Sequence, residues 1–212
     1  MSASHGPHGD EKETARIEAF SDGVFAIAIT LLILELRVPH DLTASGLRAA
    51  LVDEWPSYAA YLVSFATIGI MWINHHRLFG LIRRVDHALL ILNGLLLLTI
   101  SVVPFPTSLL ASYLGHDAGR LVAGIYSGWF VVIALTFTGL WRYAASPVRQ
   151  PPLLRVPLDG PEVRAIHAAY RFGPLWYVVA FVASFWSAVL AVAVCGALAL
   201  FFALPPKPPA DR

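Results

Sequence analysis

Charge is scarce in this chain of 212 residues: charged residues make up 14% and hydrophobic residues 57%. A soluble domain carries about 25% charged residues. A chain of 23.1 kDa has too little interior to hide so much apolar surface from water. The same balance excludes an ordinary disordered protein, which is polar and highly charged. The net charge of +1 creates no basic field, so we expect no nucleic-acid partner.

Cysteine is nearly absent, since Cys195 is the single one. One cysteine cannot form an internal disulfide or a cysteine-rich zinc or iron–sulfur site, and we expect neither a metal nor a cofactor. The residues before Phe20 include Asp10, Glu11 and Glu13, so they lack the basic start of a secretory signal. We therefore expect the first apolar segment to remain in the mature protein.

Long uncharged stretches indicate an all-α, multi-pass membrane protein without a separate soluble domain. About 20 apolar residues are needed for a helix to cross a bilayer core of about 30 Å. Stretches 55–74, 88–116 and 121–141 each predict one crossing, and Pro104 with Pro106 should kink or end the second of these. The first segment, 23–34, is long enough to cross only if Asp22 and Glu35 lie at its ends or face away from lipid. Stretch 172–206 predicts two crossings with a break near 184–187 if the first of them begins near 163–167. The expected helices are 19–38, 56–79, 86–110, 120–142, 163–183 and 187–204.

The basic residues divide unequally between the two ends of these six helices. Twelve fall on the side of the N-terminus: Lys12, Arg16, Arg77, Arg83, Arg84, Arg142, Arg149, Arg155, Arg164, Arg171, Lys207 and Arg212. Three fall on the other side: Arg37, Arg48 and Arg120. Cytoplasmic loops carry the excess of Lys and Arg, so both termini should be cytoplasmic in a cell (inner) membrane.

This topology divides the chain into a cytoplasmic N-terminus (1–18), a transmembrane domain (19–204) and a cytoplasmic tail (205–212). A proline-rich segment, 146–161, predicts an extended cytoplasmic linker. A model with five crossings would move only Lys207 and Arg212 to the other side. The charge bias therefore supports the orientation better than it supports the last crossing.

The first helix presents an apolar stripe and a polar cluster. The stripe falls at positions i, i+3, i+4 and i+7: Ile27, Thr30, Leu31 and Leu34. The cluster lies at the cytoplasmic entrance of the helix: Arg16, Phe20, Ser21 and Asp22. Such a cluster is costly in hydrocarbon unless its polar groups find partners.

The second and third predicted helices offer those partners at the same end. The second contributes Trp72, Asn74, His75 and His76, and the third opens with Asp86, His87 and Asn93. The His, Asn and Trp side chains among them can donate to Asp22 or accept from Ser21 and Arg16. We therefore expect a hydrogen-bonded network that ties the first three helices together.

The segment Arg16–Asp22 has the pattern R-x-x-x-F-S-D and continues as G-V-F-A-I-A-I-T-L-L, and the second helix carries W-I-N-H-H-R over 72–77. These motifs resemble the prokaryotic members of the lysosomal potassium channel family (transmembrane protein 175). The expected number of transmembrane helices, six, is similar to that of the family as well.

The resemblance implies a homotetramer of six-helix subunits in which the first helix of each subunit lines a central pore. It implies cation conduction that prefers potassium over sodium through a hydrophobic constriction. By position, Ile27, Leu31 and Leu34 would line the pore with Thr30 as a polar neighbour, and the Arg16–Asp22 cluster would hold the helix. The expected partners are other copies of the chain, membrane lipids and permeating potassium ions.

The sequence itself agrees with a hydrophobic constriction in place of a carbonyl-lined filter. No T-V-G-Y-G sequence occurs, and the segment 124–128 (G-I-Y-S-G) is not such a filter. Symmetry can bring several copies of one helix around an axis, and apolar rings then close the path by dewetting. Potassium holds its water less tightly than sodium, which gives the sign of the preference.

Other interpretations remain open at this point. The stripe on the first helix can be packing between helices, and the chain can be a small secondary transporter, although no internal repeat is visible. A membrane protein that uses His75 and His76 is a further alternative. Neighbouring residues on a helix point about 100° apart, so these two do not form a joint metal site, and we expect no enzyme. A pH effect through these histidines is a hypothesis.

Overall fold

The structure, a computed structural model, describes residues 7–40, 43–148 and 151–203. Within these ranges the regular elements are all helical: α1 (Pro7–Leu31), η1 (Leu32–Glu35), α2 (Ala44–Asp53), α3 (Trp55–Leu81), α4 (His87–Ser101), α5 (Pro104–Tyr113), α6 (Gly119–Ala144), α7 (Pro161–Arg171), α8 (Gly173–Ala183) and α9 (Ala188–Ala203). The predicted all-α class is confirmed. The expected tail, 205–212, lies outside the described residues.

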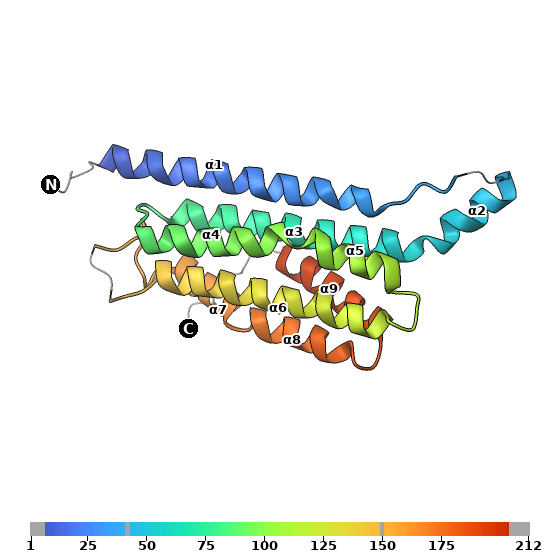
Figure 1. The fold of residues 1–212 in the computed structure, drawn as a ribbon. Helices are drawn as coiled ribbons and strands as arrows, with labels where there is room; N and C mark the ends of the chain where they lie inside the picture. The colour runs from blue at the N-terminus through green and yellow to red at the C-terminus, as the bar shows by residue number, and fades with distance from the viewer. Residues whose placement is uncertain (1–6, 41–42, 149–150, 204–212) are drawn as a thin grey trace.

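The long helices lie side by side in one bundle (Figure 1). Helix α1 forms one side of the bundle and packs on α3 and α4, while α6, α8 and α9 lie on the other side. Helix α3 contacts both α1 and α9, so it separates the two sides. Helix α2 lies beyond the end of the bundle that is opposite the N-terminus.

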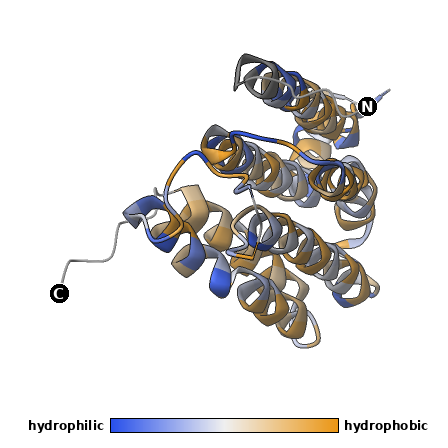
Figure 2. Ribbon diagram, turned by 90° about the vertical axis from the view of Figure 1, so that its left-hand side faces the viewer, coloured by the Kyte–Doolittle hydropathy of each residue, from blue (hydrophilic) through white to orange (hydrophobic). Residues whose placement is uncertain are grey.

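Four helical segments of the described chain are long and apolar enough to span a membrane: Lys12–Glu35, Trp55–Leu81, His87–Tyr113 and Gly119–Ala144. They correspond to the first four predicted crossings. Figure 2 shows that hydrophobic residues dominate the helices of the bundle. The chain is therefore an all-helical membrane protein, and the count of six crossings stays a prediction.

The first helix begins twelve residues before the predicted start at residue 19. The residues that precede the apolar segment, such as Glu13 and Lys12, are strong helix formers, so the helix continues outward beyond the apolar part. Its last turn tightens into the short helix η1, which ends at Glu35. The predicted end at residue 38 is therefore three residues too late.

The third and fifth predicted helices are each interrupted. Helix 86–110 is divided at Val102–Val103, directly before Pro104, as the prolines predict. Helix 163–183 is divided into α7 and α8 at Phe172, because Pro174 has no N–H to donate to the carbonyl of Tyr170 and instead occupies the first turn of α8. At about 1.5 Å per residue, α8 alone covers about half of a bilayer core.

A short additional helix, α2, lies in the connection between the first two crossings, where we expected a loop. Its N-cap is Thr43, whose side-chain oxygen accepts a hydrogen bond from the backbone N–H of Gly46 at 3.3 Å. None of its residues is buried. The helix therefore depends on its cap and its local propensity more than on packing.

Helix α8 packs closely along the N-terminal half of α6 at two glycines. A Cβ atom on Gly128 would lie 3.3 Å from the ring of Phe181, and one on Gly124 would lie 3.1 Å from Ser184 Oγ. Small residues four positions apart let two membrane helices approach each other in this way. The glycines therefore place α8 beside the half of α6 that lies far from the linker.

The linker joins the loop between α3 and α4 instead of lying free. The N–H of Arg83 donates to Leu153 O at 2.8 Å, and the N–H of Arg155 donates to Leu81 O at 2.9 Å. The guanidinium of Arg155 also donates to Ile82 O at 3.1 Å. This short antiparallel pairing fixes the described part of the predicted linker; residues 149–150 lie outside the described residues.

Three buried hydroxyl groups join α3, α5 and α6 at the centre of the bundle. Ser64 Oγ lies 2.9 Å from both Thr107 Oγ1 and Tyr126 OH. All three side chains are fully buried, so none can exchange its partner for water. The cluster satisfies these hydroxyls inside an otherwise apolar core.

We predict that Tyr126→Phe lowers the free energy of unfolding by about 1 kcal/mol, because it removes one partner of Ser64 without changing the ring. Denaturant unfolding of the purified protein in detergent measures the change. Tyr113→Phe, at a half-exposed ring near the end of α5, is the control and should leave stability unchanged. Equal stability of the wild type and Tyr126→Phe would contradict the predicted role.

Candidate functional site

Helix α1, together with its continuation η1, has one face buried against the subunit and one face uncovered. The buried residues are spaced three or four apart: Ser21, Phe25, Ala28 and Leu32. The uncovered residues include the whole stripe predicted from the sequence, Ile27, Thr30, Leu31 and Leu34, which we call the exposed stripe. Ile27 and Leu34 expose 62% and 71% of their surface, and Leu31 exposes 42%. So large an apolar surface calls for a covering by lipid or by another protein chain.

Thr30 is the polar member of the exposed stripe. Its hydroxyl donates to the carbonyl oxygen of Ile27 at 3.0 Å, one turn earlier in the same helix. This bond satisfies the hydrogen of the hydroxyl and leaves the lone pairs of Oγ1 turned away from it. The stripe therefore combines three aliphatic side chains with one oxygen that can act as an acceptor.

Buried polar side chains fix the opposite face of α1 to α4 and α3. Ser21 Oγ donates to Ile17 O at 2.9 Å and accepts from Asn93 Nδ2 at 3.0 Å. Asn93 Oδ1 lies 2.9 Å from His75 Nε2. Because the amide oxygen can only accept, Nε2 carries the ring proton of His75. We call Ser21, Asn93 and His75, all buried, the buried anchor.

Aromatic rings enclose the His75 end of the buried anchor. The ring of Phe79 stacks on the imidazole with a centroid distance of 4.3 Å, and Phe25 of α1 lies 5.4 Å away. In the described structure His75 Nδ1 is buried without a hydrogen-bond partner. The site therefore holds the imidazole mainly through Asn93 and through packing.

A second pair of contacts joins α1 to α3 closer to the surface. Trp72 Nε1 donates to Asp22 Oδ1 at 2.8 Å, and His76 Nδ1 lies 2.6 Å from Glu18 Oε1. Both pairs are four residues apart on their helices, so they form successive rungs between α1 and α3. The sequence already singled out three of these side chains; the partner role of Glu18 was missed, although its spacing from Asp22 indicates it.

The structure brings together five of the eight residues that we predicted for the network: Ser21, Asp22, Trp72, His75 and His76. Arg16 and Phe20 lie instead along a surface groove between α1 and α4, and Phe20 is 68% exposed. Asn74 points to the other side of α3, where its Nδ2 donates to Phe202 O of α9 at 3.4 Å. Asn93, which we expected among the partners that the third helix offers, is the central member.

The two neighbouring histidines diverge, as helix geometry requires. His75 turns to Asn93 of α4, while His76 turns to Glu18 of α1. In the described part of the chain no group of three His, Cys, Asp or Glu side chains could hold a metal ion. The arrangement can fasten helices, and it offers no set of ligands.

Fold and site together define a membrane protein whose first helix is anchored on one face and uncovered on the other. Residues 16–104, which hold this helix and its anchor, match the family model described as endosomal/lysosomal potassium channel TMEM175. A potassium channel of Chamaesiphon minutus is 54% identical over 197 residues, covering 92% of this chain and 96% of that protein. A potassium channel of Streptomyces collinus is 47% identical over 191 residues, covering 90% and 91%.

The crystal structure of a lysosomal potassium-selective channel TMEM175 homologue from Chamaesiphon minutus superposes with a TM-score of 0.82. The two chains are 52% identical in that comparison, which covers 91% of this chain and 97% of the other. The chain belongs to the TMEM175 family, and the resemblance inferred from the R-x-x-x-F-S-D motif is confirmed.

We predict that Asn93→Leu lowers the free energy of unfolding by about 1–3 kcal/mol, because Ser21 and His75 both lose a buried partner. Thermal or denaturant unfolding in detergent measures the change. Asn74→Leu is the matched control. It removes an amide whose hydrogen bond to Phe202 O, at 3.4 Å, lies outside the buried anchor, so the loss of stability should be smaller. If both variants lose the same stability, the buried anchor has no special role.

Proposed function

We propose that this protein is a potassium-permeable channel formed by four copies of the chain around helix α1. The observation that carries the proposal is the exposed stripe, an apolar face of α1 that the subunit leaves uncovered. Relatives that align over nearly the whole chain are named potassium channels. A ring of identical helices around a symmetry axis can enclose a continuous aqueous path.

In this assembly the exposed stripe faces the axis of symmetry. Ile27, Leu31 and Leu34 follow one another at intervals of three or four residues, so they form stacked rings separated by about one helical turn. Apolar rings of this kind hold back ions by dewetting. Potassium passes more readily than sodium because it gives up its water at lower cost, and Thr30 Oγ1 offers a passing cation an oxygen between the rings.

The buried anchor and the two surface rungs then set the rotation of α1. If the helix turned by one residue, about 100°, Ser21 would leave Asn93 and the stripe would leave the axis. Ser21, Asp22, Trp72, His75 and His76 are in this view positioning residues that never meet the ion. They hold the apolar rings in register.

The fifth and sixth crossings complete the subunit as a short hairpin of α8 and α9, with its turn at residues 184–187. Both termini then lie at the basic end of the bundle, where α3 and α6 end. That end carries Arg77, Arg83, Arg142 and Arg155, while Arg37 and Arg120 belong to the opposite end. The excess of basic residues supports a cytoplasmic location for both termini in the cell membrane.

We predict that Leu31→Ala raises potassium flux severalfold and reduces the preference for potassium over sodium, because a wider, wetter ring retains more of the ion's hydration. Flux into proteoliposomes under potassium and sodium gradients measures both. Leu190→Ala, a half-exposed position of α9 on the far side of the bundle, is the control and should conduct like the parent. Unchanged flux in Leu31→Ala, or saturable coupled uptake by the parent, would contradict the proposal.

A cysteine at the axis tests the assembly directly. We predict that Leu34→Cys, in a Cys195→Ala background, forms intersubunit disulfides under mild oxidation, because symmetry brings the residue close to its own copies. Val179→Cys, on the outer side of α8, should not cross-link. Native mass spectrometry should give a mass of four chains. A monomeric mass, or cross-linking only at residue 179, would overturn the arrangement around α1.

A further inference from the structure

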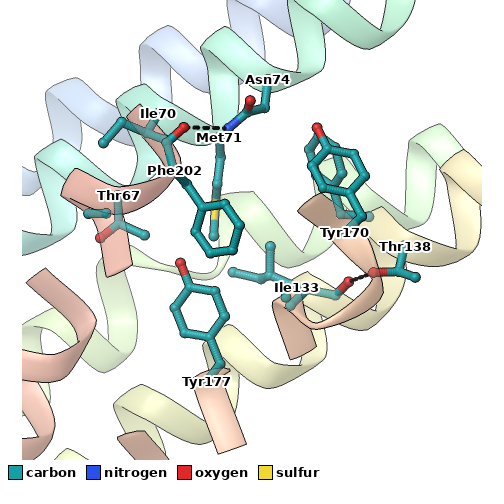
Figure 3. A pocket seen from close by; sticks show the side chains of 13 residues that line it. Thr67, Ile70, Met71, Asn74, Ile133, Thr138, Tyr170, Tyr177 and Phe202 are labelled. Carbon is teal, nitrogen blue, oxygen red and sulfur yellow. Dashed lines mark hydrogen bonds between the residues drawn. The ribbon is translucent and has the colours of Figure 1, made fainter. Parts of the chain in front are cut away.

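The far side of the bundle holds an apolar cleft that the proposed pore does not use. It lies between α3, α6, α8 and α9, near the junction of α7 and α8 (Figure 3). Met71, Ile133, Phe137 and Phe202 give it apolar walls. The few hydroxyls on its lining are partly engaged, since Thr138 Oγ1 donates to Ala134 O at 2.7 Å. An apolar chain can occupy such a cleft without losing hydrogen bonds.

A basic pocket adjoins this cleft at the C-terminal end of α6. Arg142 and Arg171 line it together with His167 and Trp141. Both guanidinium groups belong to exposed residues, and among the described residues neither is ion-paired. Arg171 lies over the ring of its neighbour Phe172, 5.3 Å from the centroid. Two unpaired cations at one pocket favour an anionic occupant.

The cleft and the basic pocket are two parts of one site. Thr138 and Tyr170 line both of them. The Tyr170 ring packs edge-on against Phe137 at 5.3 Å on the apolar side and against Trp141 at 6.5 Å on the basic side. A ligand that fills the site must therefore be apolar at one end and negatively charged at the other.

His167 adds a hydrogen-bond donor to the charged end. Trp141 Nε1 donates to His167 Nδ1 at 3.3 Å, so the neutral ring carries its proton on Nε2. The amphipathic helix α7 is a feature of the membrane–water interface, the depth at which lipid headgroups lie. Basic pockets between helices at that depth bind acidic phospholipid headgroups.

We propose that this site binds an anionic phospholipid, with its phosphate group at Arg142 and Arg171 and an acyl chain in the apolar cleft. The inference does not depend on the proposed pore, which lies on the opposite side of α3. It assigns a role to the break between α7 and α8, which carries Arg171 and Tyr170 to the end of α6.

The first experiment titrates the purified full-length protein with phosphatidylglycerol and with phosphatidylcholine of the same acyl chains, and counts bound lipid by native mass spectrometry. Phosphatidylglycerol should bind, and phosphatidylcholine should bind much more weakly. Arg142→Gln with Arg171→Gln should lower the affinity for phosphatidylglycerol about 30-fold. Equal binding of the two lipids would overturn the proposal.

Arg164→Gln is the matched control, because Arg164 lies on α7, as Arg171 does, and its guanidinium donates to Asp159 O outside the basic pocket. It removes one positive charge and should leave the affinity for phosphatidylglycerol nearly unchanged. A loss as large as that of Arg171→Gln alone would show a diffuse charge effect and would contradict a built site.

A third arm separates a lipid from a free phosphate. Ala134→Phe should fill the apolar cleft and lower the affinity for phosphatidylglycerol with long acyl chains. Phosphatidylglycerol with six-carbon acyl chains should still bind at the arginines. Inorganic phosphate should displace neither lipid at millimolar concentration. Displacement by inorganic phosphate, together with unchanged long-chain binding in Ala134→Phe, would identify an anion site and overturn the assignment to lipid.

Discussion

The requirement that polar side chains inside a membrane find partners governs this subunit. Ser21, Asn93 and His75 are buried among apolar helices, and Asn93 of α4 pairs with both Ser21 of α1 and His75 of α3. The alternative, an unpaired amide or imidazole in an apolar interior, costs more than the net gain of the bond itself. Hydrophobic packing permits many rotations of α1, whereas this chain of bonds permits one. The uncovered face of α1 is therefore a consequence of the buried one.

Much of this could be predicted from local sequence. Uncharged runs predicted the second, third and fourth long segments, and helix periodicity predicted that Ile27, Thr30, Leu31 and Leu34 share a face. A proline in the first turn of the following helix marks both breaks, the one before Pro104 and the one at Phe172, yet we joined 163–183 because apolar length dominated the interpretation. Gly173 and Pro174 were the available signal for that break.

The remainder depends on which helices become neighbours. Asn74 was grouped with His75 by proximity in sequence, but a step of one residue turns the side chain by about 100°, and there it meets Phe202 of α9. That α9 lies on this side of α3 is a property of the bundle and not of residues 72–77. Asn93 shows the converse case, since its central role follows only from the placement of α4 beside α1.

Helix α3 gives the two sides of the subunit a physical connection. One face carries Trp72 and His76 to α1 and His75 to Asn93 of α4, and the other carries Met71 and Asn74 to the apolar cleft and α9. Because packed helices shift as rigid bodies and not by continuous deformation, an occupant of the cleft can act on α1 by moving α3. Such coupling requires that the occupant prefer one position of α3 over another, since a ligand that binds both equally shifts nothing. The fold thus holds its apolar stripe and its cleft on opposite sides of the subunit, and α3 connects them through the buried anchor and through the Trp72 and His76 contacts with α1.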